Sequence, residues 1–101
     1  MRNIKIDMYY VYILFCQKDG KLYIRFTSDL KKRVLKHKSG FVLATKHRGP
    51  VRLIYYEAYL NEDDARQREK YLKGGKGHSE LKIQLVHILG KLGYKYVNPR
   101  Y

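Results

Sequence analysis

The sequence contains one cysteine, Cys16, and no tryptophan. A single cysteine excludes a disulfide within the chain and a thiolate cluster for zinc, so a reducing, cytoplasmic setting is expected. No apolar run reaches the roughly 18 to 20 residues that a membrane-spanning helix needs. Residues 1–5 also lack the apolar stretch of a secretory signal. These absences predict a protein without a membrane partner.

Acidic residues are scarce as well. There are 9 Asp and Glu against 22 Lys and Arg, which gives a formal net charge of +13. Repulsion on this scale destabilises a small domain unless a polyanion neutralises it, and nucleic acid is the usual partner. A merely soluble basic surface and an anionic membrane are the alternatives. The membrane is disfavoured because the basic residues are spread along the whole chain instead of lying on one helix.

The length of 101 residues fits a single domain, 1–101, with a core at about 8–90 and a tail at 91–101 that we expect to fray. Three runs rich in β-branched and aromatic residues predict strands, at 8–15, 22–27 and 51–59. Capping residues and apolar spacing predict helices at about 30–39, 61–73 and 79–92. This ββαβαα order indicates an α+β domain, in which a small three-stranded, mostly antiparallel sheet is flanked by helices.

Each predicted helix begins at a candidate capping residue. Thr27 or Ser28 is expected to cap the first helix, Asn61 the second and Ser79 the last, because their side-chain oxygens can accept hydrogen bonds from free N–H groups. The acidic run after Asn61 favours a helix start, since the helix dipole stabilises anions there.

Three polar residues fall on faces that should be apolar. Arg33 and His37 border the inner stripe of the first helix, and Glu69 shares the inner stripe of the second. An inward carboxylate needs a cation, an arginine or a metal. The alternatives without a metal are a structural Glu69–Arg33 ion pair, or a helix in which Arg68 takes the inner position and Glu69 is solvated.

The first two strands should form a hairpin with Tyr12 and Tyr23 on the same face. A turn of even length makes the sum of paired positions odd, which places even positions of the first strand beside odd positions of the second. If the loop is 16–19, the two tyrosines are directly opposed. Two phenols facing an arginine, a histidine and a carboxylate suggest a phosphodiester site.

These residues also stand in a recurring order. The first motif is Tyr10-Val11-Tyr12, and the second, Tyr23-Ile24-Arg25, begins with a tyrosine 11 positions after Tyr12. The segments 27–33 with His37, 53–57 and 65–73 complete the pattern. Over roughly residues 8 to 85 the chain resembles the GIY-YIG nucleases, particularly their small single-domain bacterial members.

The resemblance implies metal-dependent cleavage of a phosphodiester in DNA or RNA. Glu69 would hold a single divalent cation, usually Mg²⁺, and Arg33 would stabilise the phosphate charge in the transition state. Tyr12, with His37 beside it, would position or deprotonate the attacking water, and Tyr23 would orient the phosphate or that water.

Further phosphate contacts are expected from Lys32, Lys46 and His47. Arg25 departs from the family pattern, which has glycine there. By the parity argument its side chain points toward the site, where it could pair with Glu69 and displace the metal, or act as an added phosphate clamp.

Three functions therefore remain open. The first is a Mg²⁺-dependent endonuclease of low sequence specificity for single- or double-stranded DNA. The second is a nucleic-acid-binding module that Arg25 has deprived of cleavage. The third is a basic structural domain in which Arg33 and Glu69 simply pair.

Overall fold

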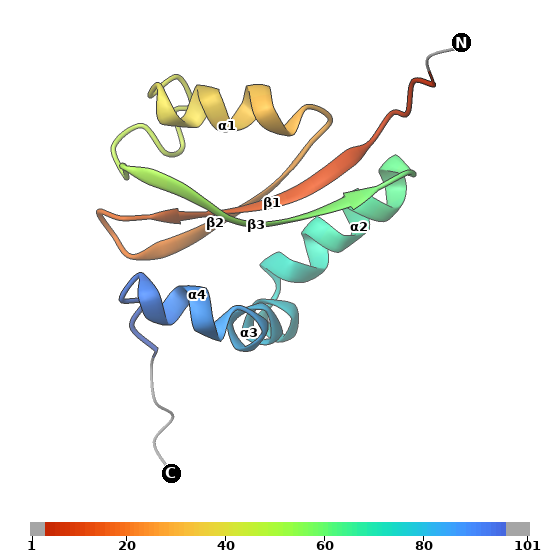
Figure 1. The fold of residues 1–101 in the computed structure, drawn as a ribbon. Helices are drawn as coiled ribbons and strands as arrows, with labels where there is room; N and C mark the ends of the chain where they lie inside the picture. Colours follow the sequence, from red (N-terminus) through yellow and green to blue (C-terminus); the bar gives the residue numbers. More distant parts are fainter. Residues whose placement is uncertain (1–3, 97–101) are drawn as a thin grey trace.

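The computed structural model describes residues 4–96. Its elements are, in order, β1 (Tyr9–Cys16), β2 (Lys21–Thr27), α1 (Leu30–Lys38), β3 (Val51–Tyr59), α2 (Glu62–Lys73), α3 (Gly75–Gln84) and α4 (Val86–Lys91). The three strands pair antiparallel in the order β2-β1-β3, so β1 is central. The predicted α+β architecture with a three-stranded sheet is confirmed (Figure 1).

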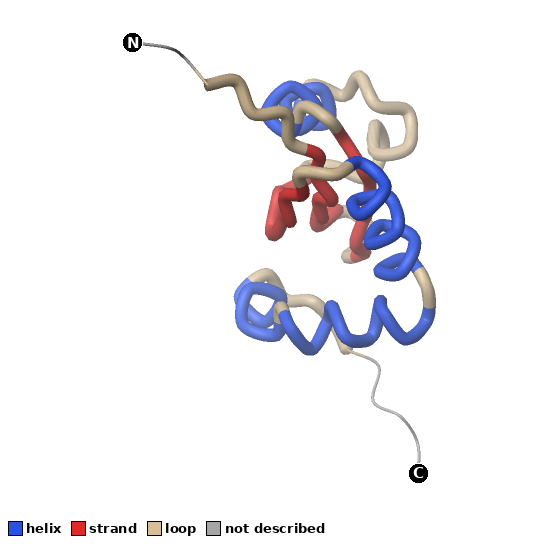
Figure 2. The backbone as a smooth tube through the Cα atoms, turned by 90° about the vertical axis from the view of Figure 1, so that its right-hand side faces the viewer, coloured by secondary structure: helices blue, strands red, loops and turns tan. Residues whose placement is uncertain are grey.

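The sheet separates two packing layers. Helix α1 covers one face, while α3 and α4 lie on the other, with α2 descending from the end of β3 toward them (Figure 1). The strands lie between these helical layers in the perpendicular view (Figure 2). Val11, Ile13 and Phe15 point into the main core, and Tyr12 and Leu14 point toward α1. This alternation is the period of a strand buried on both faces.

The hairpin register settles how the two tyrosines lie. Tyr12 pairs with Arg25, and Leu14 pairs with Tyr23. The connecting turn is therefore 17–20, with Gly20 at φ 68°. Tyr12 and Tyr23 share a face, as predicted, but they are diagonal neighbours; the directly opposed arrangement would need the loop to begin at Cys16, which instead still belongs to β1.

The caps of the first two helices differ in how well they were predicted. Asp29, and neither Thr27 nor Ser28, caps α1, because its carboxylate accepts a hydrogen bond from the backbone N–H of Lys32 at 3.1 Å. The hydroxyl of Thr27 instead accepts the N–H of Asp29 itself at 3.1 Å. Asn61 caps α2 as expected, through hydrogen bonds from two backbone N–H groups.

The predicted last helix is wrong in its start and its continuity. Ser79 lies inside α3, which begins at Gly75 directly after α2. This tight junction requires Gly77, where a Cβ would collide with the backbone carbonyl of Tyr71. A break at Leu85 then separates α3 from α4.

The predicted apolar face nevertheless continues across that break. Leu81, Leu85 and Leu89 are all buried in the main core. Beyond α4, Tyr94 packs against that core, and the hydroxyl of Tyr96 donates to the carbonyl of Lys82 at 2.7 Å. The rest of the tail that was expected to fray, 97–101, lies outside the described residues. None of the helices within 4–96 is long and apolar enough to cross a membrane.

Candidate active site

A buried chain of hydrogen bonds joins α1 to the sheet. The Nε of Arg33 donates to the hydroxyl of Tyr12 at 3.4 Å, and that hydroxyl lies 2.8 Å from Nε2 of His37. The other ring nitrogen of His37, Nδ1, lies 2.8 Å from the hydroxyl of Thr45. Tyr12, His37 and Thr45 are each at most 3% exposed. The structure thus brings together three of the predicted site residues and adds Thr45.

The donors in this chain assign the protons. Arg33 can only donate, so the Tyr12 oxygen accepts from it and the phenol proton is left for Nε2 of His37. In the tautomer that matches this arrangement Nε2 is unprotonated, and Nδ1 carries the ring proton and donates to the hydroxyl oxygen of Thr45. In this tautomer His37 can accept the Tyr12 proton.

Burial and local charge keep Tyr12 and His37 neutral at physiological pH. Burial raises the pKa of the Tyr12 hydroxyl, although the hydrogen bond from Arg33 opposes that shift. Burial lowers the pKa of His37 to about 4, and the nearby charges of Arg33 and Arg25 add to the effect. Tyr12 is thus a phenol and His37 a neutral imidazole when no substrate is bound.

Arg25 occupies the space beside Tyr23. Its Nε donates to the Tyr23 hydroxyl at 3.1 Å, and its guanidinium carbon lies 5.5 Å from the ring centroid. Arg48 approaches the same ring at 5.9 Å, and His37 contacts it edge-on at 5.2 Å between centroids. The hydrogen bond to Tyr23 raises the pKa of Arg25 further, so this side chain remains charged. As predicted, Arg25 points toward the site.

Glu69 lies at the outer edge of β2. Its carboxylate accepts the backbone N–H of Phe26 at 3.2 Å and the ammonium of Lys73 at 2.9 Å, and its side chain is 15% exposed. The alternative of a Glu69–Arg33 ion pair is wrong: Arg33 bonds to Tyr12, and the partner of Glu69 is Lys73, one turn along the same helix. The possible Arg25–Glu69 pair is likewise replaced by the bond from Arg25 to Tyr23.

The neighbouring Arg68 has a separate, structural role. It forms two hydrogen bonds with the carboxylate of Glu57, at 2.9 and 3.1 Å. The hydroxyls of Tyr55 and Tyr59 donate to the same carboxylate. Arg68 thus ties α2 to β3, while the mostly buried Glu69 faces β2, so the alternative of a solvated Glu69 is also wrong.

The residues around Glu69 fit a cation that the substrate helps to bind. Residues 4–96 contain no group of three or more His, Cys, Asp and Glu side chains placed to hold a metal ion. Mg²⁺ commonly binds through one or two carboxylates and completes its shell with water and substrate phosphate. Glu69 is a carboxylate of this kind, and its Lys73 partner, whose side chain is 41% exposed, can turn to solvent when a cation takes its place.

The remaining predicted phosphate contacts lie on the surface. Lys32 is exposed on α1, beside Arg33 in a shallow groove, and Lys46 and His47 are exposed on the 41–50 loop. They stay predictions. The residues predicted from the sequence did not include Thr45 and Arg48. The signal that could have pointed to them is their position in the 41–50 loop, beside Lys46 and His47.

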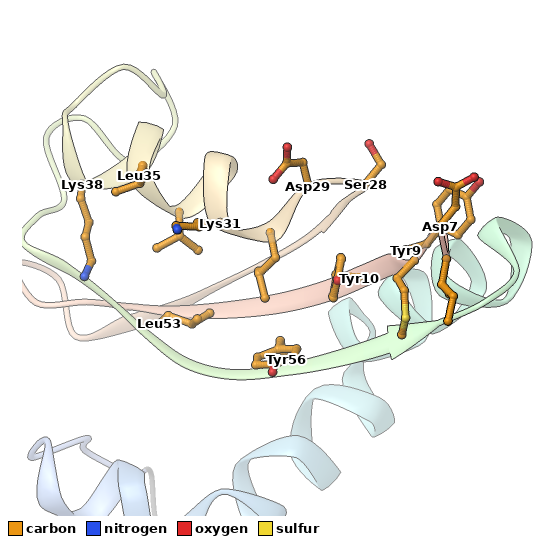
Figure 3. A pocket seen from close by; sticks show the side chains of 14 residues that line it. Asp7, Tyr9, Tyr10, Ser28, Asp29, Lys31, Leu35, Lys38, Leu53 and Tyr56 are labelled. Atoms are coloured by element: carbon orange, nitrogen blue, oxygen red, sulfur yellow. The ribbon is translucent and has the colours of Figure 1, made fainter. Parts of the chain in front are cut away.

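A larger hollow lies elsewhere. A cavity of about 750 Å³ opens between α1 and the strands β1 and β3, with Tyr10, Leu35, Leu53 and Tyr56 among its lining residues (Figure 3). None of the nine predicted site residues lines it. The predicted tyrosines, arginines and histidine are instead joined to one another by the contacts described above, so chemistry outweighs cavity size in placing the site.

This fold and this constellation define a nuclease-type α+β domain. The model of the GIY-YIG catalytic domain matches residues 8–82, and the chain belongs to the GIY-YIG family. It is similar to a UPF0213 protein of Clostridium perfringens, with 44% identity over 78% of this chain and 83% of the relative. A UPF0213 protein of Staphylococcus saprophyticus is 38% identical over 77% of this chain and 95% of its own length.

A solved relative is also available. The solution NMR structure of a UPF0213 protein from Bacillus halodurans is 36% identical and covers 77% of this chain and 84% of that chain, with a TM-score of 0.49. The names of these UPF0213 proteins state no substrate.

Proposed function

We propose that this protein is a divalent-metal-dependent endonuclease that hydrolyses phosphodiester bonds of DNA. The observation that carries the proposal is the Arg33–Tyr12–His37–Thr45 hydrogen-bond chain, because it links a phosphate-binding cation to a proton acceptor. The charge of +13 supports a polyanionic substrate. The matching family is a nuclease-type family.

Arg33 controls access to the Tyr12 oxygen. Tyr12 has no exposed surface in the free protein, and its hydroxyl is held by Arg33 at 3.4 Å, at the long end for a hydrogen bond. A substrate phosphate offers Arg33 a stronger, charged acceptor. When Arg33 turns to the phosphate, the Tyr12 oxygen becomes free to accept a hydrogen bond from a water.

Proton transfer then follows the chain. As the water oxygen attacks phosphorus, its proton moves to the Tyr12 oxygen, and the Tyr12 proton moves to Nε2 of His37. The bond from phosphorus to the leaving oxygen breaks, and that oxygen takes a proton from solvent. The phosphate charge offsets the charges of Arg25 and Arg33 that lower the His37 pKa, so the imidazolium forms more easily than in the free protein.

Glu69 would hold the cation. When bound, Mg²⁺ supplies positive charge to the phosphate oxygens. The protein presents the Glu69 carboxylate at the edge of β2, where a hydrogen bond from the N–H of Phe26 holds it in place. Tyr23 lies between His37 and Arg25, where its hydroxyl can orient the phosphate.

The proposal is tested by separating binding from cleavage. Arg33→Ala should bind DNA nearly as well as the unaltered protein but lose roughly 10²-fold or more in cleavage rate, as expected for a charge that acts in the transition state. Lys36→Ala, which removes a neighbouring exposed charge of α1, is the matched control. Equal loss in both variants would count against a catalytic role for Arg33.

A second candidate is a nucleic-acid-binding module without cleavage. The specific observation that favours it is the Arg25 side chain, which binds the Tyr23 hydroxyl where the family pattern has glycine. Under this candidate, the unaltered protein binds DNA without cutting it, and Arg25→Gly restores cutting. Cleavage by the unaltered protein with Mg²⁺ would dismiss it.

A further inference from the structure

The outer edge of β2 carries backbone N–H groups that point away from the sheet. β2 is an edge strand, and the N–H of Phe26 points away from β1, because it donates to Glu69. The β1–β2 register runs without a shift, so N–H groups two and four residues earlier point in the same direction. These are the N–H groups of Ile24 and Leu22.

A groove runs beside these donors. Its volume is about 310 Å³, and it lies between β2 and the junction of α2 with α3. Its lining is Leu22, Tyr23, Ile24, Arg25, Lys73 and His78, which includes the two cationic side chains Arg25 and Lys73. In the free protein the Lys73 ammonium is paired with the Glu69 carboxylate at 2.9 Å. Outward N–H groups beside a guanidinium and an ammonium form an environment for an anionic oxygen.

His78 is already oriented by the fold. Its Nδ1 lies 3.3 Å from the carbonyl oxygen of Leu72, which can only accept, so Nδ1 carries the ring proton. In the neutral ring Nε2 is then an acceptor and does not bind a phosphate oxygen. His78 takes no part in the proposed chemistry, and Lys73 enters it only as the partner that Glu69 gives up to a cation.

We propose that this groove binds the backbone of a single nucleic-acid strand next to the cleaved phosphate. Lys73, Arg25 and the N–H groups of Ile24 and Leu22 contact its phosphate oxygens. Leu22 to Phe26 spans roughly 14 Å of extended strand, long enough for more than one phosphate. The inference rests on the proposed function. It adds that the substrate is a nucleic-acid strand whose backbone is accessible along one side.

A protein strand is a poorer occupant of the same edge. Pairing by strand addition needs a run of free backbone groups, and Glu69 already occupies the edge at Phe26. The positive charge of Lys73 beside a short edge also discourages strand pairing. A phosphate backbone needs only separate donors and cations, which the groove supplies.

Amide NMR of the uniformly labelled chain tests the proposal. A short oligothymidylate and, in a separate sample, inorganic phosphate are titrated at low salt without any divalent cation. The oligonucleotide should shift the amides of Leu22 and Ile24, and inorganic phosphate should shift them much less. Unmoved edge amides at saturation, or equal shifts with inorganic phosphate, would overturn the proposal.

Variants separate a specific contact from general charge. Lys73→Ala should reduce the slope of log affinity against log salt by about 1. Lys73→Arg should keep the slope, and Lys91→Ala, at the exposed end of α4, should leave it unchanged. Equal slopes for Lys73→Ala and Lys91→Ala would also overturn the proposal. These binding measurements involve neither a metal nor cleavage, so their outcome does not depend on the proposed chemistry. If the protein cleaves DNA but the amides of Leu22 and Ile24 do not shift, only the proposal for the groove is rejected.

Discussion

Thr45 offers a direct test of how the site is organised. Its hydroxyl is buried and lies 2.8 Å from Nδ1 of His37. Thr45→Val keeps the shape of the side chain but removes the oxygen that accepts the ring proton. A buried polar group left without its partner costs about 1–3 kcal/mol. The free energy of unfolding should therefore fall by about that amount.

Urea unfolding and ring-nitrogen NMR measure the two consequences. For an unfolding slope of about 1–3 kcal/mol per molar urea, the midpoint should fall by about 1 M. The unaltered protein should show the Nδ1–H tautomer of His37, and Thr45→Val should move it toward a mixture, since neither tautomer is then fully bonded. Thr45→Ser is the control: it keeps the hydroxyl and loses one methyl group, so stability falls by about 0.8 kcal/mol with the tautomer unchanged.

Either of two results would contradict this role of Thr45. One is a Thr45→Val protein that unfolds at the same urea concentration as the unaltered chain. The other is an unaltered protein whose His37 carries its proton on Nε2, because the Tyr12 proton would then have no place in the hydrogen-bond chain.

Further predictions concern pH and packing. His37 has a pKa of about 4 in the fold against an ordinary 6.5; the unfolded chain therefore binds more protons between these values, and stability should fall by up to about 3 kcal/mol as pH drops through that window. His37→Gln should remove this part of the pH dependence in urea titrations. Gly77→Ala should lower the thermal midpoint, at a cost of roughly 1–3 kcal/mol, because its Cβ meets the carbonyl of Tyr71, whereas Gly75→Ala, with open space, should not. Equal midpoints for the two glycine variants would contradict the tight α2–α3 junction.

Local periodicity was enough to predict where the main site residues point. Arg33 and His37 were predicted to border the inner face of the first helix, and the structure places them against Tyr12. Strand parity predicted that Tyr12 and Tyr23 share a face, and the register confirms it. Both inferences depend only on the fixed geometry of helices and strands.

The pairing of charges could not be predicted in the same way. The alternative of a Glu69–Arg33 pair fails because α1 and α2 pack against opposite sides of the sheet, and the nearer Lys73 reaches Glu69 within its own helix. The role of Thr45 depends on the path of an irregular loop. That path is fixed by contacts distant in sequence, such as the ion pair of Arg48 with Asp19 and the hydrogen bond from the N–H of Gln17 to the carbonyl of Pro50.

Cleavage with and without Mg²⁺ is the decisive test of the proposed nuclease activity. Purified protein is incubated with single- and double-stranded DNA, with Glu69→Ala as the matched blank that reveals any contaminating nuclease. The account predicts cutting that requires both Mg²⁺ and Glu69, with DNA binding retained in the variant. Cutting that persists in Glu69→Ala, or that is indifferent to Mg²⁺, would contradict it.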